Sequence, residues 1–273
     1  QMVSDALDRT VAMLQAASDL DVTQDGNTIT ARVTNWSGHK LPTGFPEGRR
    51  IWVNAQFFDA NDSLVEEIGH YDYGTAVLDV TDTKIYEMKL GIDATMAALT
   101  NLPEGETFHL ILANEILKDN RIPPVGYTVE GFEGIQASPV NYSYADGQHW
   151  DDTVMTIPDE AVKVVVTVYS QTTSKEYIEF LRDANVTDDT GQIAYDAWVA
   201  RGKSAPVAMD SVELPLHSTL PGDADGDGDV DVDDLLAMLT NYGCVGSCQG
   251  DFNGDGVVDV NDILIVLANW TGV

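Results

Sequence analysis

The chain is poor in basic residues, and it lacks any long apolar run. Only 14 of its 273 residues are lysine or arginine, against 45 acidic ones, which leaves a net charge of −31. A chain this acidic does not neutralise phosphates, so nucleic acid and anionic membrane surfaces are not expected as partners. No apolar run reaches the roughly 18 residues of a membrane-spanning helix, and we expect no membrane span.

Residues that usually carry catalysis or cofactors are also scarce or wrongly spaced. The five histidines form no HExxH or other close metal-binding pattern, and no GxSxG motif occurs. The chain contains no CxxCH motif, so covalently bound c-type haem is not expected. We therefore expect no enzyme, no catalytic residue and no haem in this chain.

Only two cysteines occur, Cys244 and Cys248. A CxxxC pair can form a disulfide, supply half of a metal site or remain as two thiols, and no nearby histidine completes a zinc site. In an exported protein the disulfide is favoured. Residue 1 is Gln, which is not a translation start, so a removed leader and an extracellular or cell-surface location are expected.

What the chain does have is two aspartate-rich loops of twelve residues near its C-terminus. Residues 223–234 read DADGDGDVDVDD, and residues 251–262, which lie 28 positions later, read DFNGDGVVDVND. Both loops carry side-chain oxygens at positions 1, 3, 5, 9 and 12, glycine at position 6 and a backbone carbonyl at position 7, as calcium loops do. The predicted ligands are Asp223, Asp225, Asp227, Asp229 (carbonyl), Asp231 and Asp234, and then Asp251, Asn253, Asp255, Val257 (carbonyl), Asp259 and Asp262.

The first loop carries seven carboxylates in twelve residues, and these require a counter-charge. Two such charges about 6 Å apart repel by roughly 3 kcal/mol at an effective dielectric near 20. A solvated acidic linker would show no register, whereas the ligand register occurs twice here. Magnesium fits less well because it prefers a smaller octahedral site. We therefore expect two calcium ions in this region.

Each loop leads into a short amphipathic helix. Helical spacing places three apolar residues after each loop on one face: Leu235, Leu236 and Leu239, then Ile263, Leu264 and Leu267. Two tandem loop–helix units with Asp at position 12 resemble a type I dockerin, over residues 222–273. The resemblance implies calcium-dependent docking onto a β-sandwich (cohesin-like) partner through loop positions 10 and 11. Those positions are Val232, Asp233, Val260 and Asn261, which differ from the Ser-Thr pair of cellulosomal dockerins.

The region before these loops is predicted to be rich in strands. A helix is expected over residues 4–17, with Leu7, Val11 and Leu14 on one stripe. A hairpin follows, with Asp25 and Gly26 at its turn. Further strands are expected over 51–58, 84–90, 108–113, 153–157, 162–169 and 207–216, with short helices over 94–99, 175–183 and 193–200. Many short strands separated by Gly/Pro turns indicate an antiparallel β-sandwich with helical insertions.

Two stretches of this region carry a second resemblance. They are GHKLPTGFPEGRRIW at residues 38–52 and the segment from YSQTTSKEY to SAPVAM at residues 169–209. Both resemble the β-sandwich that follows the haem-binding part of secreted multihaem cytochromes, especially those of planctomycete-like bacteria. Because this chain has no haem motif, the resemblance implies the accessory fold alone.

Several further residues are candidates for binding or modification. Tyr142, Tyr144, His149 and Trp150 form an aromatic stretch that either stacks on sugar rings or packs at a sheet edge. Glu47, Arg49 and Arg50 are expected to form a buried ion network. Asn-x-Ser/Thr sequons offer glycosylation candidates at Asn61 and Asn185, which share the extended form D-A-N-x-S/T, and at Asn35, Asn141 and Asn269.

These observations combine into one prediction of fold and several hypotheses of function. The fold is expected to be mainly β, with an N-terminal helical segment (1–19), an antiparallel β-sandwich with helical insertions (20–217) and a small α-helical, dockerin-like calcium-binding domain (218–273). The leading hypothesis is a secreted, non-enzymatic structural protein that docks onto a β-sandwich partner or onto the next copy of itself in a filament. The alternatives are a carbohydrate-binding or carbohydrate-active subunit tethered by the dockerin, and an accessory domain of a haem-bearing electron-transfer assembly.

Overall fold

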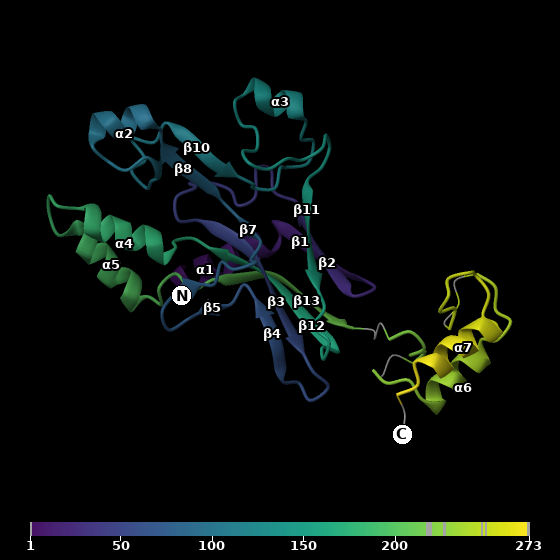
Figure 1. The fold of residues 1–273 in the computed structure, drawn as a ribbon. Coiled ribbons are helices and arrows are strands. Elements are labelled where there is room, and N and C mark those ends of the chain that lie inside the picture. Colours follow the sequence, from purple (N-terminus) through teal and green to yellow (C-terminus); the bar gives the residue numbers. More distant parts are fainter. Residues whose placement is uncertain (1, 217–219, 226–227, 247, 249, 272–273) are drawn as a thin grey trace.

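Residues 2–216, 220–225, 228–246, 248 and 250–271 are described by the computed structural model (Figure 1). A three-stranded antiparallel sheet contains β1 (Ser18–Asp25), β2 (Thr28–Asn35) and β11 (Trp150–Thr156), in the order β1-β2-β11. The hairpin turn lies one residue later than expected, because Asp25 pairs with Thr28 and leaves Gly26 and Asn27 as the turn. Gly26 has φ +53°, which suits glycine in a tight hairpin turn.

A larger antiparallel sheet has the order β13-β12-β3-β4. Its strands are β3 (Arg50–Phe58), β4 (Leu64–Ile68), β12 (Lys163–Gln171) and β13 (Val207–Pro215), and the short β7 (Ile85–Tyr86) also pairs with β3. The three long strands lie where the sequence predicts them, within two residues at each end. β4 and β7 are short strands, and β7 opens the predicted strand 84–90, which continues separately as β8 (Met88–Ile92).

The two sheets enclose the main hydrophobic core. Alternate residues face inward, as the two-residue period of a strand requires. The core consists of Leu20, Val22, Ile29, Ala31 and Val33 from the first hairpin, Ile51, Val53, Ala55 and Phe57 from β3, Val164, Val166 and Val168 from β12, and Leu41, Tyr86, Ile122, Met155, Ile157, Met209 and Leu216. This packing confirms the predicted fold class, a β-rich protein with helical insertions.

The outer face of the larger sheet is covered by a helix pair. Trp52 of β3 points away from the main core and packs with Ile178 of α4 (Lys175–Ala184) and Trp198 of α5 (Thr190–Ala200). The short strands β5 (Tyr71–Asp72) and β6 (Val77–Leu78) contribute Tyr71 and Leu78 to the same cluster. Figure 1 shows α4 and α5 side by side on one flank of the body.

A third sheet has the order β10-β8-β9 and consists of β8, β9 (Gly105–Glu106) and β10 (Glu115–Asp119). Beside it lie α2 (Ala94–Thr100) and α3 (Val129–Gly134). At the end of β10, the buried carboxylate of Asp119 accepts hydrogen bonds from Lys40 at 2.8 Å and from Arg121. This fully paired ion cluster fixes the loop after β2 against the third sheet.

The strand expected over residues 108–113 is wrong. The segment forms turns in which Leu112 and Ala113 donate to the carbonyl of His109. The ring of Phe108 packs on Tyr177 and Phe180 of α4, with centroids 5.2 and 5.5 Å apart. The apolar side chain of Phe108 is therefore buried by contact with helix α4 and not by a place in a β-sheet.

The N-terminal helix α1 (Met2–Gln15) lies against β1 and β13, with Leu14 packed on the main core. At the other end of the chain, α6 (Val232–Thr240) and α7 (Val260–Ala268) form a separate unit, side by side (Figure 1). Its buried apolar residues are Ala224, Val230, Met238, Val258 and Val266. Within the described ranges, no helix combines the length and apolar character needed to cross a bilayer.

Candidate metal centre

The carboxylate at position 12 holds the first loop closed. Asp234 is fully buried, and its Oδ1 accepts hydrogen bonds from the backbone N–H groups of Ala224 at 2.6 Å and Asp225 at 3.2 Å. Its Oδ2 accepts from the N–H of Asp231 at 2.7 Å. One side chain therefore ties loop positions 2, 3 and 9 together and, with Asp231, caps the start of α6.

The second loop repeats this arrangement 28 residues later. The buried Asp262 accepts from the N–H groups of Phe252 at 2.8 Å, Asn253 at 3.2 Å and Asp259 at 2.8 Å. Burial raises the pKa of the Asp262 and Asp234 carboxyls, but the backbone donors outweigh burial and leave each pKa below its ordinary value. Both side chains are thus held as carboxylates at neutral pH.

Positions 1 and 6 are also joined in both loops. Oδ2 of Asp223 accepts from the N–H of Gly228 at 3.1 Å, and Oδ2 of Asp251 accepts from the N–H of Gly256 at 2.9 Å. The two glycines have φ +96° and +84°, a region that side chains with a Cβ resist. Glycine at position 6 therefore lets the chain curl back towards the first aspartate.

The first loop gathers carboxylates closely enough to hold a metal ion. One oxygen each from Asp223, Asp225 and Asp234 lie within 4.8 Å of one another, and the same is true of Asp229, Asp231 and Asp234. In the second of these groups Asp229 contributes its side-chain carboxylate, whereas the sequence predicts its backbone carbonyl as the ligand. Asp227, a further predicted ligand, lies outside the described residues.

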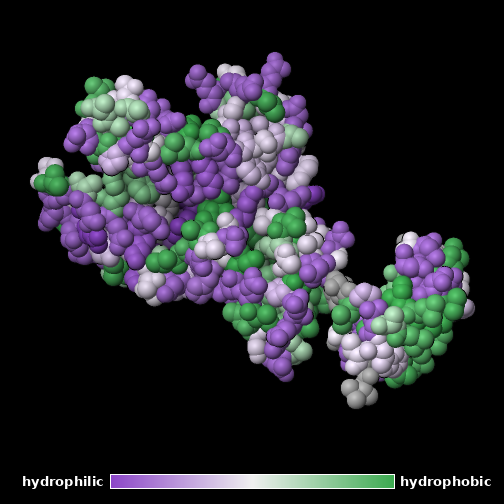
Figure 2. All heavy atoms as spheres, viewed as in Figure 1, coloured by the Kyte–Doolittle hydropathy of each residue, from purple (hydrophilic) through white to green (hydrophobic). Residues whose placement is uncertain are grey.

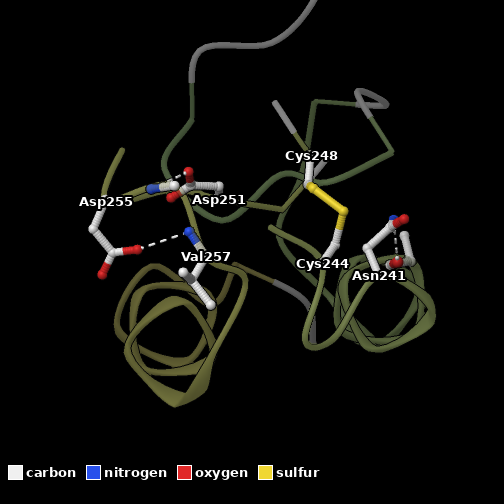
Figure 3. The surroundings of a disulfide bond; sticks show 8 residues. Asn241, Cys244, Cys248, Asp251, Asp255 and Val257 are labelled. Carbon is white, nitrogen blue, oxygen red and sulfur yellow. Dashed lines mark hydrogen bonds between the residues drawn. A yellow bond between two sulfur atoms is a disulfide. The ribbon is translucent and has the colours of Figure 1, made fainter. Parts of the chain in front are cut away.

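In the second loop, which is described throughout, no three acidic side chains meet this closely. The reason is in the sequence, because Asn253 stands where the first loop has Asp225, and Val257 stands where it has Asp229. Asp255 Oδ1 accepts from the N–H of Val257 at 2.9 Å (Figure 3), and Asp259 Oδ1 accepts from the N–H of Asn261 at 2.7 Å. The second loop therefore has the same curl with less negative charge.

One oxygen of the second loop supports the fit of a cation. Oδ1 of Asp251 is buried and has no hydrogen-bond partner in the described part of the chain, although its Oδ2 is bonded to Gly256. A buried carboxylate oxygen without a donor is costly unless a positive charge meets it. The donors of both loops are hard oxygens, which suit a hard divalent cation.

The disulfide joins Cys244 to Cys248 just before the second loop (Figure 3), with a Cα–Cα distance of 6.2 Å. Cys244 also accepts a hydrogen bond from the N–H of Val258 at 3.1 Å, and Gly243 donates to the carbonyl of Val258 at 2.8 Å. The bridged segment is therefore paired with position 8 of the second loop. The disulfide stabilises the backbone that closes this loop.

The first loop is closed by the end of the chain instead. Val230, at position 8, donates its N–H to Thr271 Oγ1 at 2.7 Å, and Thr271 donates its N–H to the carbonyl of Val230 at 2.8 Å. Thr271 follows α7, as Gly243 follows α6. Position 8 of each loop is thus paired with the segment that follows the helix of the other unit.

Apolar side chains outside the module's core form two matching rows. In each unit they recur at spacings of four, three and three residues along the helix and just past its end, and each is between 40% and 58% exposed: Val232, Leu236, Leu239 and Tyr242 in the first unit, and Val260, Leu264, Leu267 and Trp270 in the second. Figure 2 shows hydrophobic residues concentrated over this module. Leu236, Leu239, Leu264 and Leu267 therefore do not share the packed face of Leu235 and Ile263, contrary to the single face expected. Asp233 and Asn261, the remaining docking candidates, are exposed beside these rows.

The tyrosines of the aromatic stretch in the body are held by hydrogen bonds to neighbouring residues. Tyr142 donates to Asp151 at 2.7 Å and accepts from Lys84 at 2.6 Å, while the buried Tyr144 donates to the carbonyl of Asn120 at 2.7 Å. His149 meets Trp150 at an interplanar angle of 82°, which leaves no shared flat face. These contacts favour the packing interpretation of this stretch.

The five sequons differ in their surroundings. Asn35 is fully buried, and its Nδ2 donates to the carbonyls of His39, Ile122 and Pro123, so the folded chain has no room for a glycan there. This candidate was wrong because a sequon carries no information about burial. Asn61, Asn141 and Asn269 are exposed, whereas Asn185 is half-buried and its amide donates to Asp188.

Comparisons with known proteins add little. No family model matches the chain, and no curated protein matches it significantly. A search of solved structures finds the penta-heme cytochrome c552 of Thermochromatium tepidum at 16% identity and a TM-score of 0.42. The match covers 76% of this chain but only 41% of that cytochrome. This cytochrome belongs to the class of proteins that the second resemblance named. None of the comparisons finds a dockerin. A structural likeness this weak supports no functional argument.

Proposed function

We propose that this chain is a secreted, calcium-stabilised, non-enzymatic assembly protein whose C-terminal module docks onto a protein partner. The observation that carries the proposal is the repeat itself: two loops closed by the same hydrogen bonds, the first with closely spaced carboxylates, each followed by an exposed apolar row at matching positions. A surface of this kind is unusual on a monomer unless something covers it.

Calcium would be held in the first loop by Asp223, Asp225, Asp231 and Asp234, with Asp227 and Asp229 completing the set. In the second loop Asp251, Asn253, Asp255, Asp259 and Asp262 would serve, together with the carbonyl of Val257. The ion would neutralise the crowded carboxylates and meet the unpaired Oδ1 of Asp251. It would also fix the position of each helix relative to its loop, because position 12 already ties the loop to the helix start.

The docking surface would consist of the two apolar rows. Loop positions 10, Val232 and Val260, are about half exposed at the head of each row. An apolar centre with Asp233 and Asn261 at its rim has the composition of a protein interface. The partner would present a β-sandwich face, either on a separate anchoring protein or on the sandwich of another copy of this chain.

The same chemistry supports the proposal of secretion. Calcium loops of modest affinity fill where calcium is millimolar, and a disulfide between Cys244 and Cys248 persists in an oxidising compartment. A head-to-tail contact between the module of one copy and the sandwich of the next would generate a ring or a filament.

The experiment compares sedimentation of the full chain in millimolar calcium and in chelator. We expect large assemblies with calcium and monomers without it. Leu236→Lys combined with Leu264→Lys should abolish assembly, while Leu99→Lys, which changes an exposed apolar residue of α2 outside the sandwich sheets, should not. A wild-type chain that stays monomeric at high concentration would rule out self-assembly. The adaptor role would then require that a separate protein can be cross-linked to positions 236 and 264 in native material. If no protein is cross-linked there, docking is excluded.

A further inference from the structure

A pocket of about 450 Å³ lies between the third sheet and the start of α4, far in sequence from the calcium loops. It is lined by the turn before β3, by β7, β8 and β9, and by Phe108 and Ser174. The size is that of an ordinary site for a small molecule. Neither the proposed docking nor the metal loops use it.

The turn at the pocket's edge is built rigidly. Arg49 donates its N–H to the carbonyl of Pro46 at 3.2 Å, which closes a four-residue turn. Gly48 in this turn has φ +69°, and a Cβ there would lie 2.6 Å from Cβ of Tyr177 in α4. Ser174 donates its N–H to the carbonyl of Gly48 at 2.8 Å. The turn is therefore pressed onto the beginning of α4 and has little freedom.

Glu47, the residue before this glycine, is a buried acid without a partner. Its side chain is only 7% exposed, and neither carboxylate oxygen has a hydrogen-bond partner among the described residues. The ion network expected from Glu47, Arg49 and Arg50 is not formed, since no ion pair joins Glu47 to either arginine in the part of the chain described. A buried carboxylate in this state needs a cation or a donor.

Arg50, in the same pocket, has a buried N–H donor that lacks an acceptor among the described residues. Its Nε donates to Gln171 at 2.9 Å, its Nη1 lies 3.7 Å from Glu176, and its guanidinium lies over the ring of Trp52. These contacts fix the guanidinium plane. Its Nη2 is buried and has no partner among the described residues. The pocket lining thus includes a buried carboxylate without a partner, Glu47, and a buried N–H donor without a partner, Arg50 Nη2, three residues later across a tight turn.

A second buried donor without a partner among the described residues is Nε of Arg49, which also lines the pocket, whereas the lining lysines are paired. Lys118 is paired with Glu87 at 2.9 Å, and Lys89 with Glu106 at 3.0 Å. The other lining side chains include apolar residues of the strands and the following segment, namely Ile85, Met88, Leu90 and Phe108. The pocket therefore combines a buried carboxylate, two buried arginine donors without partners and an apolar wall.

We infer that this pocket binds a free α-amino acid with an apolar side chain. Its ammonium group would meet Glu47, its carboxylate would accept a hydrogen bond from Nη2 of Arg50, and its side chain would lie against Phe108 and Met88. An α-amino acid carries its two charges on groups attached to one carbon atom, which suits two protein groups placed on a single turn. A ligand with only one of the charges leaves one buried group unmet.

The test is calorimetric titration of the full chain with L-leucine, with 4-methylpentanoate, which lacks the amine, and with 3-methylbutylamine, which lacks the carboxylate. We expect saturable binding of leucine and at least tenfold weaker binding of the two analogues. No saturable leucine binding up to roughly 10 mM, or equal binding of either analogue, would overturn the inference.

Glu47→Gln separates a binding role from a structural one. The variant removes an uncompensated buried charge at constant size, so its melting temperature without ligand should rise while leucine binding falls at least tenfold. Glu66→Gln, on the exposed strand β4, should change neither. If Glu47→Gln binds leucine as the wild type does, or melts lower than the wild type, Glu47 is not the ammonium site. Arg50→Lys, which keeps the charge, should weaken leucine binding in the same assay; unchanged affinity would exclude the carboxylate contact.

Discussion

Removal of calcium should unfold the C-terminal module and leave the β-rich body intact. Within each acidic group of the first loop, the carboxylate oxygens lie within 4.8 Å of one another. Charges at about 5 Å repel by about 3 kcal/mol per pair at an effective dielectric near 20. Among the described residues, the core that opposes this repulsion contains five buried apolar residues with six partly buried ones packed against them, and domains this small are marginal without a metal or disulfide.

The expected size of the effect follows from mass action. At a calcium concentration about 100 times its Kd, each bound ion stabilises the folded state by about 2.7 kcal/mol, so two ions contribute about 5 kcal/mol. In hydrogen exchange of the full chain, amides of α6 and α7 should lose protection by roughly 10⁴-fold in excess chelator. Amides of β3 and β12 belong to a different core and should keep their protection.

Variants make this prediction specific. Asp223→Ala with Asp251→Ala should show the unprotected state even in calcium, because both first ligands and both loop-closing hydrogen bonds are lost. Asp233→Asn removes a charge from an exposed position outside the ligand register and should behave as the wild type does. If α6 and α7 keep full protection in chelator, calcium-linked folding is refuted.

Other predictions concern charge in the loops and in the body. Asp225→Asn should weaken calcium binding at the first loop and Asn253→Asp should strengthen it at the second, each by about tenfold in calorimetry; unchanged affinities would exclude position 3 as a ligand. Burial raises the pKa of Asp119, but hydrogen bonds from Arg121 and Lys40 outweigh it and lower that pKa. The contribution of ionised Asp119 to folding stability is therefore complete at pH values above the ordinary carboxyl pKa, and it is lost as the pH falls below about 4. Asp119→Asn should cost about 3–5 kcal/mol in urea unfolding at pH 7 and flatten this acid dependence; an unchanged midpoint would contradict it.

The features that could be predicted from the sequence are those that depend on residues close together in the chain. Strand alternation placed β2, β3, β12 and β13, and the loop register identified a closely spaced acidic group in the first loop. The position 12 aspartates bond to backbone within their own loops, so spacing alone located them. Helices α2, α4 and α5 also lie close to their expected ranges.

What could not be predicted depends on residues far away in the chain. Phe108 belongs to an apolar run that looks like a strand, and only the position of α4 shows why it is apolar. The short strands β5, β6 and β9 exist through pairing rather than through their own pattern. Glu47 stands next to two arginines, but a tight turn and the partners of Arg50 keep them apart. Asn35 has the sequence of a sequon and the environment of a core residue.

The cross-pairing of the two loops has a consequence for how such a module can be cut or fused. Val230 is bonded to Thr271, 41 residues later, and Val258 is bonded to the segment just after α6. Neither half is complete alone, so a truncation that removes Thr271 should first weaken the first loop, which lies farther from Thr271 in sequence than the second loop does. By the same pairing, a fusion partner attached directly after Thr271 should disturb the acidic loop that contains Val230 before it disturbs the loop that contains Val258.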